Sequence, residues 1–396
     1  MQFAKPEMRL ESHLKKAGVQ WSSVLNLKDW TKYWELNENP PDLDPDLKFL
    51  EQWLNSGAHA QMHYLAKNSQ ARKDPRLILE RVSSIISLII PYATGHSVRN
   101  QPAQRAEDEK INSGILQKTA RYARVPDYHR SIKKALDQVM TQWQREVMES
   151  NTHPQDLSWR VVTDSLPFLD RAHARIAGLG FVGKNTMLIR PGVGSFFFIA
   201  HILVSAPFEV VADANLTKPL AAEAIQSLTC GDCRLCLDAC PTSALLENRF
   251  LDSNRCLSYL TIENREIISD EFVTHLQNQF YGCDICQDVC PYNLKTTDLQ
   301  TIAQLRSPRK ILNEVSLHDV AGMSPSQYET WFGGSAMTRA KYGGLVRNAL
   351  YALHALNDQE IERLLETRST DSDLLIRSTV AHIRKIRTHP IGNDPK

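Results

Sequence analysis

Four apolar runs in the first half of the chain predict the strands of a sheet. The clearest is the β-branched run over 82–92, which reads Val-Ser-Ser-Ile-Ile-Ser-Leu-Ile-Ile-Pro-Tyr and is typical of a buried strand. The other three lie at 160–164, 186–190 and 195–205. Polar residues with scattered glycine and proline fill 94–113, which predicts a long loop.

Helical patterns separate these runs and dominate both ends of the chain. A long, charged and periodic stretch predicts a helix over 118–150, broken near Pro126. An amphipathic stretch predicts a second helix over 169–179 that ends at a glycine. Strands and helices in this order indicate an α/β (α+β) domain with mixed strand connections. Residues 1–80 and the region beyond Lys310 are expected to be mostly helical.

Two similar segments near the C-terminus predict a short helical repeat. One begins at Leu345 and the other at Leu374, and both carry leucine, arginine and alanine at helical spacing. Units roughly 30 residues apart resemble HEAT-like repeats. Two repeats cannot form a solenoid alone, so we expect them to pack on the rest of the chain.

Composition and charge are those of an ordinary globular protein. The 396 residues are enough for two to three domains, and 42% of them are hydrophobic. A formal net charge of +1 gives no general attraction to nucleic acid or to a membrane. The N-terminus has no apolar signal core and no twin arginines, and no run of 18 apolar residues is present. We therefore expect a cytoplasmic protein without a membrane partner.

All eight cysteines lie between residues 230 and 290. The first four follow the spacing C-x2-C-x2-C-x3-C-P, which is typical of bacterial ferredoxins with two 4Fe–4S clusters. A second run ends at Pro291 and lacks its first cysteine, because Phe280 stands in that place. Cys256, which lies alone between the two runs, can supply the missing ligand.

The crossing rule of two-cluster ferredoxins assigns the ligands. Three close cysteines of one run hold a cluster, and the cysteine before the proline reaches across to the other cluster. This rule predicts one cluster on Cys230, Cys233, Cys236 and Cys290, and a second on Cys240, Cys256, Cys283 and Cys286. Thiolate is suitable chemistry because soft sulfur ligands favour iron–sulfur clusters.

Three other interpretations of the cysteines are weaker. Disulfides need an oxidising compartment, which nothing in the sequence indicates. Structural zinc sites usually pair two C-x2-C knuckles, whereas here three cysteines precede a fourth and a proline. Inert buried cysteines would not repeat this spacing.

The best candidate for a reaction site is Thr163-Asp164-Ser165, together with the glycine-containing loop 180–185. Asp164 ends a predicted strand, where a carboxyl group can face a pocket. In an apolar pocket its pKa would rise and it could donate a proton. The alternative is that Asp164 or Ser165 simply caps the next helix, and that the loop is only a helix end and turn. Neither a dinucleotide fingerprint nor a phosphate-binding P-loop is present.

Taken together, these motifs resemble the epoxyqueuosine reductase family, whose members use cobalamin and iron–sulfur clusters in the synthesis of queuosine in tRNA. The resemblance covers about residues 53–350 and is specific because the motifs occur in one order. The matching segments are the cysteine runs and residues 121–129, 164–165, 177–186, 256–263 and 334–341. The N-terminal fifth diverges, and Val125-Pro126 replaces a glycine-containing form before Asp127.

The resemblance implies that the α/β domain binds cobalamin beside one cluster. His129 is not expected to bind cobalt, because Ile132 replaces the glycine of the Asp-x-His-x-x-Gly motif that provides such a ligand. The family therefore implies a cobalt whose lower face has no protein histidine. Contacts with the cofactor are expected from Asp127, Tyr128, Asp164, Lys184, Asn185 and Ser258.

The implied reaction converts the epoxide of epoxyqueuosine in tRNA to the alkene of queuosine. It uses two electrons from an unknown external donor and two protons, and it releases water, with Asp164 as the proton donor. Arg339, Lys341 and Arg347 are expected to contact tRNA phosphates. Residues 301–396 hold 13 basic and 10 acidic side chains, however, so their charge alone is no strong RNA signal.

The resemblance and the motifs predict four regions in a monomer. These are a helical region over 1–80, a cobalamin-binding α/β domain over 81–222, a ferredoxin-like domain over 223–300 and a helical HEAT-like region over 301–396. Two alternatives remain open. One is a corrinoid reductive dehalogenase-like enzyme, and the other is an electron-transfer protein that uses the rest of the chain for docking.

Overall fold

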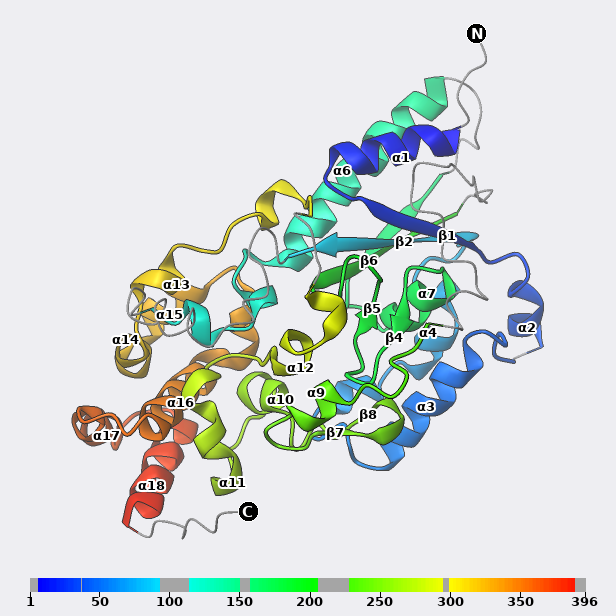
Figure 1. Ribbon diagram of the computed structural model, residues 1–396. Coiled ribbons are helices and arrows are strands. Elements are labelled where there is room, and N and C mark those ends of the chain that lie inside the picture. Colours follow the sequence, from blue (N-terminus) through cyan, green and yellow to red (C-terminus); the bar gives the residue numbers. More distant parts are fainter. Residues whose placement is uncertain are drawn as a thin grey trace.

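A four-stranded antiparallel sheet forms the centre of the first half of the chain (Figure 1). The computed structural model describes residues 6–36, 38–92, 114–149, 157–205, 228–294 and 299–388. The strand order is β1-β2-β6-β3, with bounds Trp21–Asn26, Ser84–Pro91, Phe197–Val204 and Trp159–Val162. The predicted loop 94–113 and the domain boundary at 222–223 lie outside the described residues.

Three of the four predicted strands are members of this sheet, and the fourth is not. The run 186–190 contributes only β5, Leu188–Ile189, which pairs with β4, Phe181–Val182, in a separate hairpin. The prediction of a mostly helical N-terminal region was incomplete, because β1 forms an edge strand of the main sheet. All pairings in the main sheet are antiparallel, so the fold is α+β.

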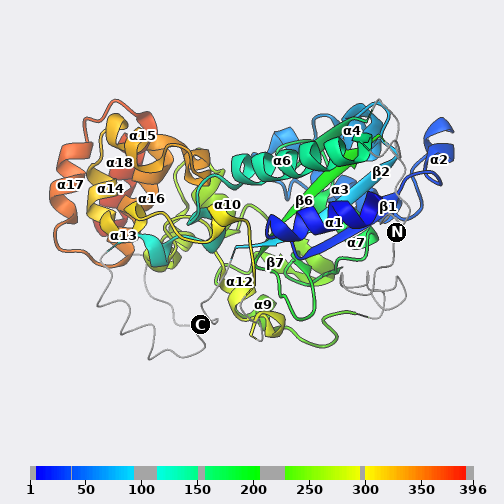
Figure 2. The same cartoon turned by 90° about the horizontal axis from the view of Figure 1, so that it is seen from above.

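Helices cover both faces of the sheet (Figures 1 and 2). On one face α1, Pro6–Lys16, and α6, Tyr128–Glu149, pack on Ile86, Leu88 and Ile90 of β2. Since successive side chains of a strand point to opposite faces, Ile85 packs on the other face with Phe168 and Leu203. That face is covered by α7, Asp170–Ile176, and by α3, Asp44–Asn55.

The predicted helix breaks occur near the expected residues. A helical turn, Arg121–Ala123, precedes Pro126, and α6 begins two residues after the proline. Along α6 the side chains of Ile132, Leu136, Met140 and Trp143 are fully buried. Their spacing of three or four residues places them on the face toward the sheet.

The cysteine segment consists of short helices between the sheet and the C-terminal helices. These are α9, Leu235–Asp238, α10, Leu257–Ile262, α11, Asp270–Val273, and α12, Ile285–Asp288. A small hairpin, Leu245–Leu246 with Phe250–Leu251, follows α9. Figure 2 shows α10 and α12 between the sheet and the C-terminal helices.

The C-terminal part is helical, as predicted, and is built around α16. Its helices are α13, Ile311–Glu314, α14, Leu317–Gly322, α15, Pro325–Phe332, α16, Lys341–Ala355, α17, Ile361–Arg368, and α18, Leu374–Thr388. Capping boxes start α14 at Ser316 and α15 at Ser324. Every α16 residue from Gly343 to Leu353 is buried, so the other helices pack around it. Within the described part of the chain, no helix has the length and apolar character needed to cross a membrane.

Candidate functional site

Four thiols from both cysteine runs lie together beside α9. Burial raises the pKa of Cys236 to about 11, and the neighbouring thiols of Cys230, Cys290 and Cys233 add to this rise. Burial also raises the pKa of Cys290; a hydrogen bond from the Tyr292 backbone opposes this rise, and the thiols of Cys230 and Cys233 add to it. The structure therefore brings together the four cysteines that the crossing rule places on one cluster.

The other four thiols form a second neighbourhood. Burial raises the pKa of Cys283, and the thiols of Cys256 and Cys240 contribute in the same direction. The pKa of Cys286 is also raised, by burial and then by Cys283 and Cys256. Cys236 of the first set influences Cys286 as well, so the two sets lie next to each other.

Two groups of four thiols match the number of protein ligands that two 4Fe–4S clusters require. Within the described ranges, no three or more Cys, His, Asp or Glu side chains are arranged to hold a metal ion. Bound iron would remove the protons from the thiols, because coordination deprotonates them despite their burial.

The loop 180–185, which was predicted to form part of the reaction site, packs against both sets of cysteines. The backbone N–H of Lys184 donates to Cys230 Sγ over 3.4 Å, and its Nζ donates to the Gly231 carbonyl over 2.9 Å. The side chain of Asn185 is buried and donates to the Cys286 carbonyl. Ser258 lies two residues after Cys256 and is half-buried in α10.

Asp164 lies two residues after the end of β3 and faces the start of α6. Its Oδ1 atom is 2.6 Å from His129 Nε2, and its Oδ2 atom accepts a hydrogen bond from the Tyr128 hydroxyl. On the other side of the imidazole, His129 Nδ1 is 2.9 Å from Asp127 Oδ1. The structure thus brings Asp127, Tyr128 and Asp164 together, with His129 joining the two carboxylates.

Two expectations for Asp164 were wrong. The side chain is 53% exposed and contacts polar groups, so it is not held in an apolar pocket. It also does not cap the next helix, because α7 begins at Asp170 and no side chain caps it. The backbone of Asp164 has a φ of 34°, a left-handed conformation that is uncommon outside glycine.

Two side chains with raised pKa values, His129 and Tyr128, contact the Asp164 carboxyl. Burial disfavours the charged form of His129, but hydrogen bonds and charges from Asp164 and Asp127 outweigh it and raise the His129 pKa above its ordinary value. Burial and the charge of Asp164 raise the pKa of Tyr128 well above its ordinary range. Tyr128 therefore remains a neutral hydroxyl donor to the carboxylate.

We call the group of Asp127, Tyr128, His129 and Asp164 the Asp164 corner. A series of tyrosines connects it to the second cysteine set. The rings of Tyr128 and Tyr122 have centroids 6.2 Å apart, and those of Tyr122 and Tyr281 are 6.4 Å apart. Tyr281 comes two residues before Cys283 in the sequence. The Asp164 corner and the second set of thiols are thus close neighbours in the fold.

The three basic residues expected to contact tRNA differ in position. Arg339 is half-exposed, pairs with Glu263 at 2.7 Å and lies over the Tyr64 ring at 5.0 Å. Lys341 is exposed at the start of α16. Both can reach an external partner.

The prediction for Arg347 was wrong. Its guanidinium is fully buried and donates to the carbonyl oxygens of Leu260, Asn264 and Glu266. Burial lowers its pKa to about 10, and the carbonyls replace the water that a charged group would otherwise require. Arg347 therefore anchors α16 to the cysteine segment and cannot contact RNA.

The sequence analysis missed several polar residues around this site. Burial raises the pKa of Tyr64, and the charges of Glu263, Arg339 and Asp164 also act on this pKa, so Tyr64 lies near Asp164. Ser87 and His201 lie opposite each other in the centre of the sheet. A polar residue in the middle of an apolar strand is the signal that could have identified Ser87 and His201.

Two family models match the chain. One described as "4Fe-4S double cluster binding domain" covers residues 229–293, and one described as "Epoxyqueuosine reductase QueG, DUF1730" covers residues 72–165. The first match supports iron–sulfur clusters as cofactors.

Curated relatives extend the similarity over most of the chain. An epoxyqueuosine reductase of Cyclobacterium marinum is 35% identical over 77% of this chain and 87% of its own length. One from Pseudomonas aeruginosa is 32% identical over 83% of this chain and 84% of its own length.

Solved structures have the same fold. A crystal structure of epoxyqueuosine reductase with an epoxyqueuosine-modified tRNA stem loop matches with a TM-score of 0.73 and 25% identity, over 95% of this chain and 88% of the other. A structure from Bacillus subtilis, described as having an aspartate catalytic loop swung out of the active site, matches with a TM-score of 0.71 and 25% identity, over 95% and 89%.

Proposed function

Because this chain belongs to the epoxyqueuosine reductase family, we propose that it reduces epoxyqueuosine to queuosine in tRNA. The epoxide gains two electrons and two protons, and it leaves an alkene and one water molecule. A relative of known structure holds an epoxyqueuosine-modified tRNA stem loop, which supports tRNA as the substrate of this chain too. The observation that carries the proposal is the position of the Asp164 corner beside two complete sets of four cysteines.

The two thiol sets are assigned to two 4Fe–4S clusters. Cys230, Cys233, Cys236 and Cys290 would hold the first, and Cys240, Cys256, Cys283 and Cys286 the second. Backbone N–H groups of Lys184 and Ala244 donate to the sulfurs of Cys230 and Cys240. Such hydrogen bonds to sulfur adjust the reduction potential of a cluster.

Cobalamin is assigned to the region between the Asp164 corner and the cysteine segment. When bound, it would supply a reduced cobalt that delivers electrons to the epoxide carbon. Both ring nitrogens of His129 face carboxylates, which supports a cobalt without a histidine from this position. Asp127 and Tyr128 would contact the cofactor from the Asp164 side, and Lys184, Asn185 and Ser258 would contact it from the cysteine side.

Asp164 is the proposed proton donor to the departing oxygen. Its carboxyl is exposed enough to meet a substrate, and the imidazolium of His129 lies 2.6 Å away, where it can return a proton to it. Tyr128 orients the second carboxylate oxygen through its hydroxyl. The turn 163–169 is the counterpart proposed for the aspartate catalytic loop of the Bacillus subtilis relative.

The flanking bases and phosphates of the tRNA are proposed to meet Arg339, Lys341 and Tyr64. Tyr64 is half-exposed, with Arg339 over its ring, and an exposed aromatic face of this kind can stack on an unpaired base. The C-terminal helices that carry Arg339 and Lys341 would act as a HEAT-like support for the RNA.

The test is to purify the protein without oxygen after expression with cobalamin, and to measure its metals and its activity. About eight irons and one cobalt per chain are expected. Epoxyqueuosine in a tRNA stem loop should lose one oxygen atom, seen by mass spectrometry of the released nucleosides. Asp164→Asn should retain the metals and lose turnover, whereas Glu362→Gln, at an exposed carboxylate on α17, should change neither.

Two results would contradict this proposal. Iron without cobalt, even after corrinoid is added, would favour an electron-transfer protein. Full turnover by Asp164→Asn would remove the role of Asp164, while leaving the reaction itself in place.

A further inference from the structure

Exposed apolar side chains lie at the surface of the first cysteine run. Leu235 on α9 is 50% exposed and Leu246 is 46% exposed. Leu246 belongs to the hairpin of β7, Leu245–Leu246, and β8, Phe250–Leu251, which lies beside α9 (Figure 1). Single exposed leucines are ordinary on a protein surface, whereas a continuous group of them indicates a contact surface.

The hairpin has an inner and an outer face, because successive side chains of a strand point in opposite directions. Leu245 is buried on the inner face, where it packs with Cys236 and Leu237 of α9. Leu246 and its cross-strand partner Phe250 lie on the outer face. The hairpin therefore presents Leu246 to solvent on one side and packs against a cysteine of the first set on the other.

The exposed side chains are neighbours. The rings of Phe250 and Phe49 of α3 have centroids 6.1 Å apart, and Phe49 is 40% exposed. An ion pair between Arg234 and Glu247 joins the start of α9 to the hairpin, so it connects the segments that carry the two leucines. The group that we call the apolar patch consists of Leu235, Leu246, Phe250 and Phe49.

The two cysteine runs differ in their exposure. Ile285 stands in the second run where Leu235 stands in the first, and it is only partly exposed. Asp284, beside Ile285, is buried and pairs with Arg121, whereas its counterpart Arg234 is 52% exposed. The second set adjoins the Asp164 corner through the tyrosine series. The first run is therefore the outer one, and the second lies toward the proposed reaction site.

We propose that the apolar patch is the docking surface for a small one-electron carrier protein that reduces the first cluster. The proposal rests on the function proposed above, because that reaction consumes two electrons from an external donor. Each docking event would oxidise the carrier by one electron and reduce the first cluster by one electron, so two events supply one turnover. Docking here brings the carrier against Leu235, the residue directly before Cys236.

The charge of this surface fits a protein partner rather than RNA. Residues 228–251 contain three acidic and two basic side chains, so they offer no positive excess to phosphates. Arg234 is already paired with Glu247 and lies 3.6 Å from Asp238. An apolar centre with a polar rim is the usual composition of a protein–protein contact.

The test compares Leu235→Gln and Leu246→Gln with Leu356→Gln in the protein loaded with its clusters. Leu356 is 43% exposed at the end of α16, outside the cysteine segment, so its variant removes a similar side chain. The probes are a bacterial ferredoxin and a flavodoxin. Binding of the oxidised probe, measured by calorimetry, is the first readout. The Kd should rise on the order of tenfold in each patch variant and remain unchanged in Leu356→Gln.

The second readout is the rate at which the reduced probe bleaches the visible absorbance of the clusters in stopped flow. At a limiting probe concentration this rate should fall on the order of tenfold in Leu235→Gln and Leu246→Gln. Dithionite is a small reductant that needs no docking surface, so it should reduce all variants at the native rate. Glutamine adds no charge, and the iron content should remain at the native value in every variant.

Three results would overturn the proposal. The first is a native protein that neither probe binds or reduces, and the second is unchanged binding in the double variant Leu235→Gln/Leu246→Gln. The third is a native dimer, seen by light scattering, that dissociates in the double variant, which would assign the patch to a second copy of this chain. All readouts are taken without epoxyqueuosine. If the native protein did not reduce epoxyqueuosine but the patch variants still lost the probe, the proposed reaction would fail and the docking surface would stand.

Discussion

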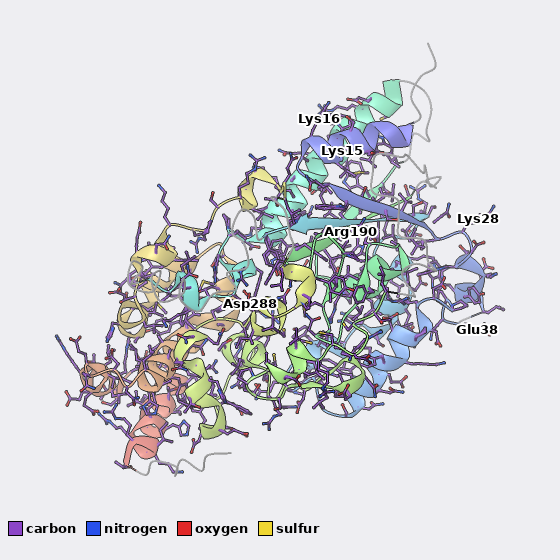
Figure 3. All side chains as sticks on the ribbon, in the orientation of Figure 1. Lys15, Lys16, Lys28, Glu38, Arg190 and Asp288 are labelled. Carbon is purple, nitrogen blue, oxygen red and sulfur yellow. The ribbon has the colours of Figure 1, made fainter. Side chains whose placement is uncertain are left out.

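Arg121 Nη1 lies 2.5 Å from Asp288 Oδ1, and this ion pair joins the segment before α6 to the second cysteine run. The backbone N–H of Arg121 also donates to Asp284 Oδ2 over 2.8 Å, and its guanidinium lies over the Phe196 ring. Asp284 and Asp288 flank Cys286, so one arginine fixes the loop that carries this thiol. Figure 3 shows Asp288 in the middle of the molecule, between the sheet and the C-terminal helices.

Replacing Arg121 with methionine should destabilise the protein by about 3 kcal/mol, because it removes an ion-pair partner that two partly buried carboxylates share. The measurement is the urea midpoint of the anaerobic, loaded protein. Arg130→Met is the matched control, since Arg130 is 83% exposed and its loss should cost less than about 0.5 kcal/mol. Equal midpoints for the two variants would show that the ion pair contributes nothing to stability.

Two of the three correctly predicted strands, β2 and β6, have apolar runs that are buried on both faces. Within β2, Ser84–Pro91, every residue is buried, so the run is continuous and unmistakable. Strand β1, Trp21–Asn26, lies at the edge of the sheet, and its burial alternates only at the start. A short edge strand with two serines has too weak a pattern to be separated from the helices around it.

The candidate site was predictable where covalent spacing fixes geometry, and less so where tertiary packing does. Cysteine spacing predicts how the eight thiols are grouped, and the structure holds them in two neighbouring groups. The burial of Arg347 could not be foreseen, because arginine on a helix usually faces water and only the docking of α10 supplies its carbonyl partners. The environment of Asp164 depends in the same way on where α6 and α7 meet the sheet.

Substitution of Arg339 should weaken tRNA binding, whereas substitution of Arg347 should destabilise the fold. Arg339→Gln should weaken binding of a tRNA stem loop and reduce the slope of log Kd against log salt by about 0.7, the loss of one phosphate contact to a single strand. Arg347→Met should leave that slope unchanged but destabilise the fold by about 3 kcal/mol, because several buried carbonyl groups lose their donor. Filter binding at several salt concentrations, together with urea titration, measures both. An unchanged slope in Arg339→Gln would remove Arg339 from the RNA surface.

Cys256→Ala should remove one cluster and spare the other. Cys256 lies with Cys240 and Cys283 and replaces the cysteine that is missing at Phe280, whose side chain is fully buried. Iron should fall from about eight to about four per chain, and the remaining signal in electron paramagnetic resonance should be that of the first cluster. Replacing a cysteine of the first set, as in Cys233→Ala, should remove the complementary signal. Loss of all iron in Cys256→Ala would mean that the two clusters cannot be assembled independently.

The pairing of His129 with two carboxylates should make stability depend on pH. Hydrogen bonds and charges from Asp164 and Asp127 raise the folded-state pKa of His129 above its unfolded value, although burial opposes this. The stability that comes from the charged pair is therefore fully present below about pH 6.5 and is lost as pH rises through the folded-state pKa. His129→Gln should lower the melting temperature by about 1–2 °C at pH 6 and by less at pH 9, a small effect because the imidazole is partly exposed.

Asp127→Asn supplies the control for this effect. It leaves Asp164 in place and removes one of the two carboxylates, so the difference between pH 6 and pH 9 should be reduced but not abolished. In the double variant with His129→Gln, the Asp127 substitution should add little at either pH, since its partner is already gone. If His129→Gln instead lowered the melting temperature equally at both pH values, the imidazole would stabilise the corner by packing on Tyr128 rather than by its charge.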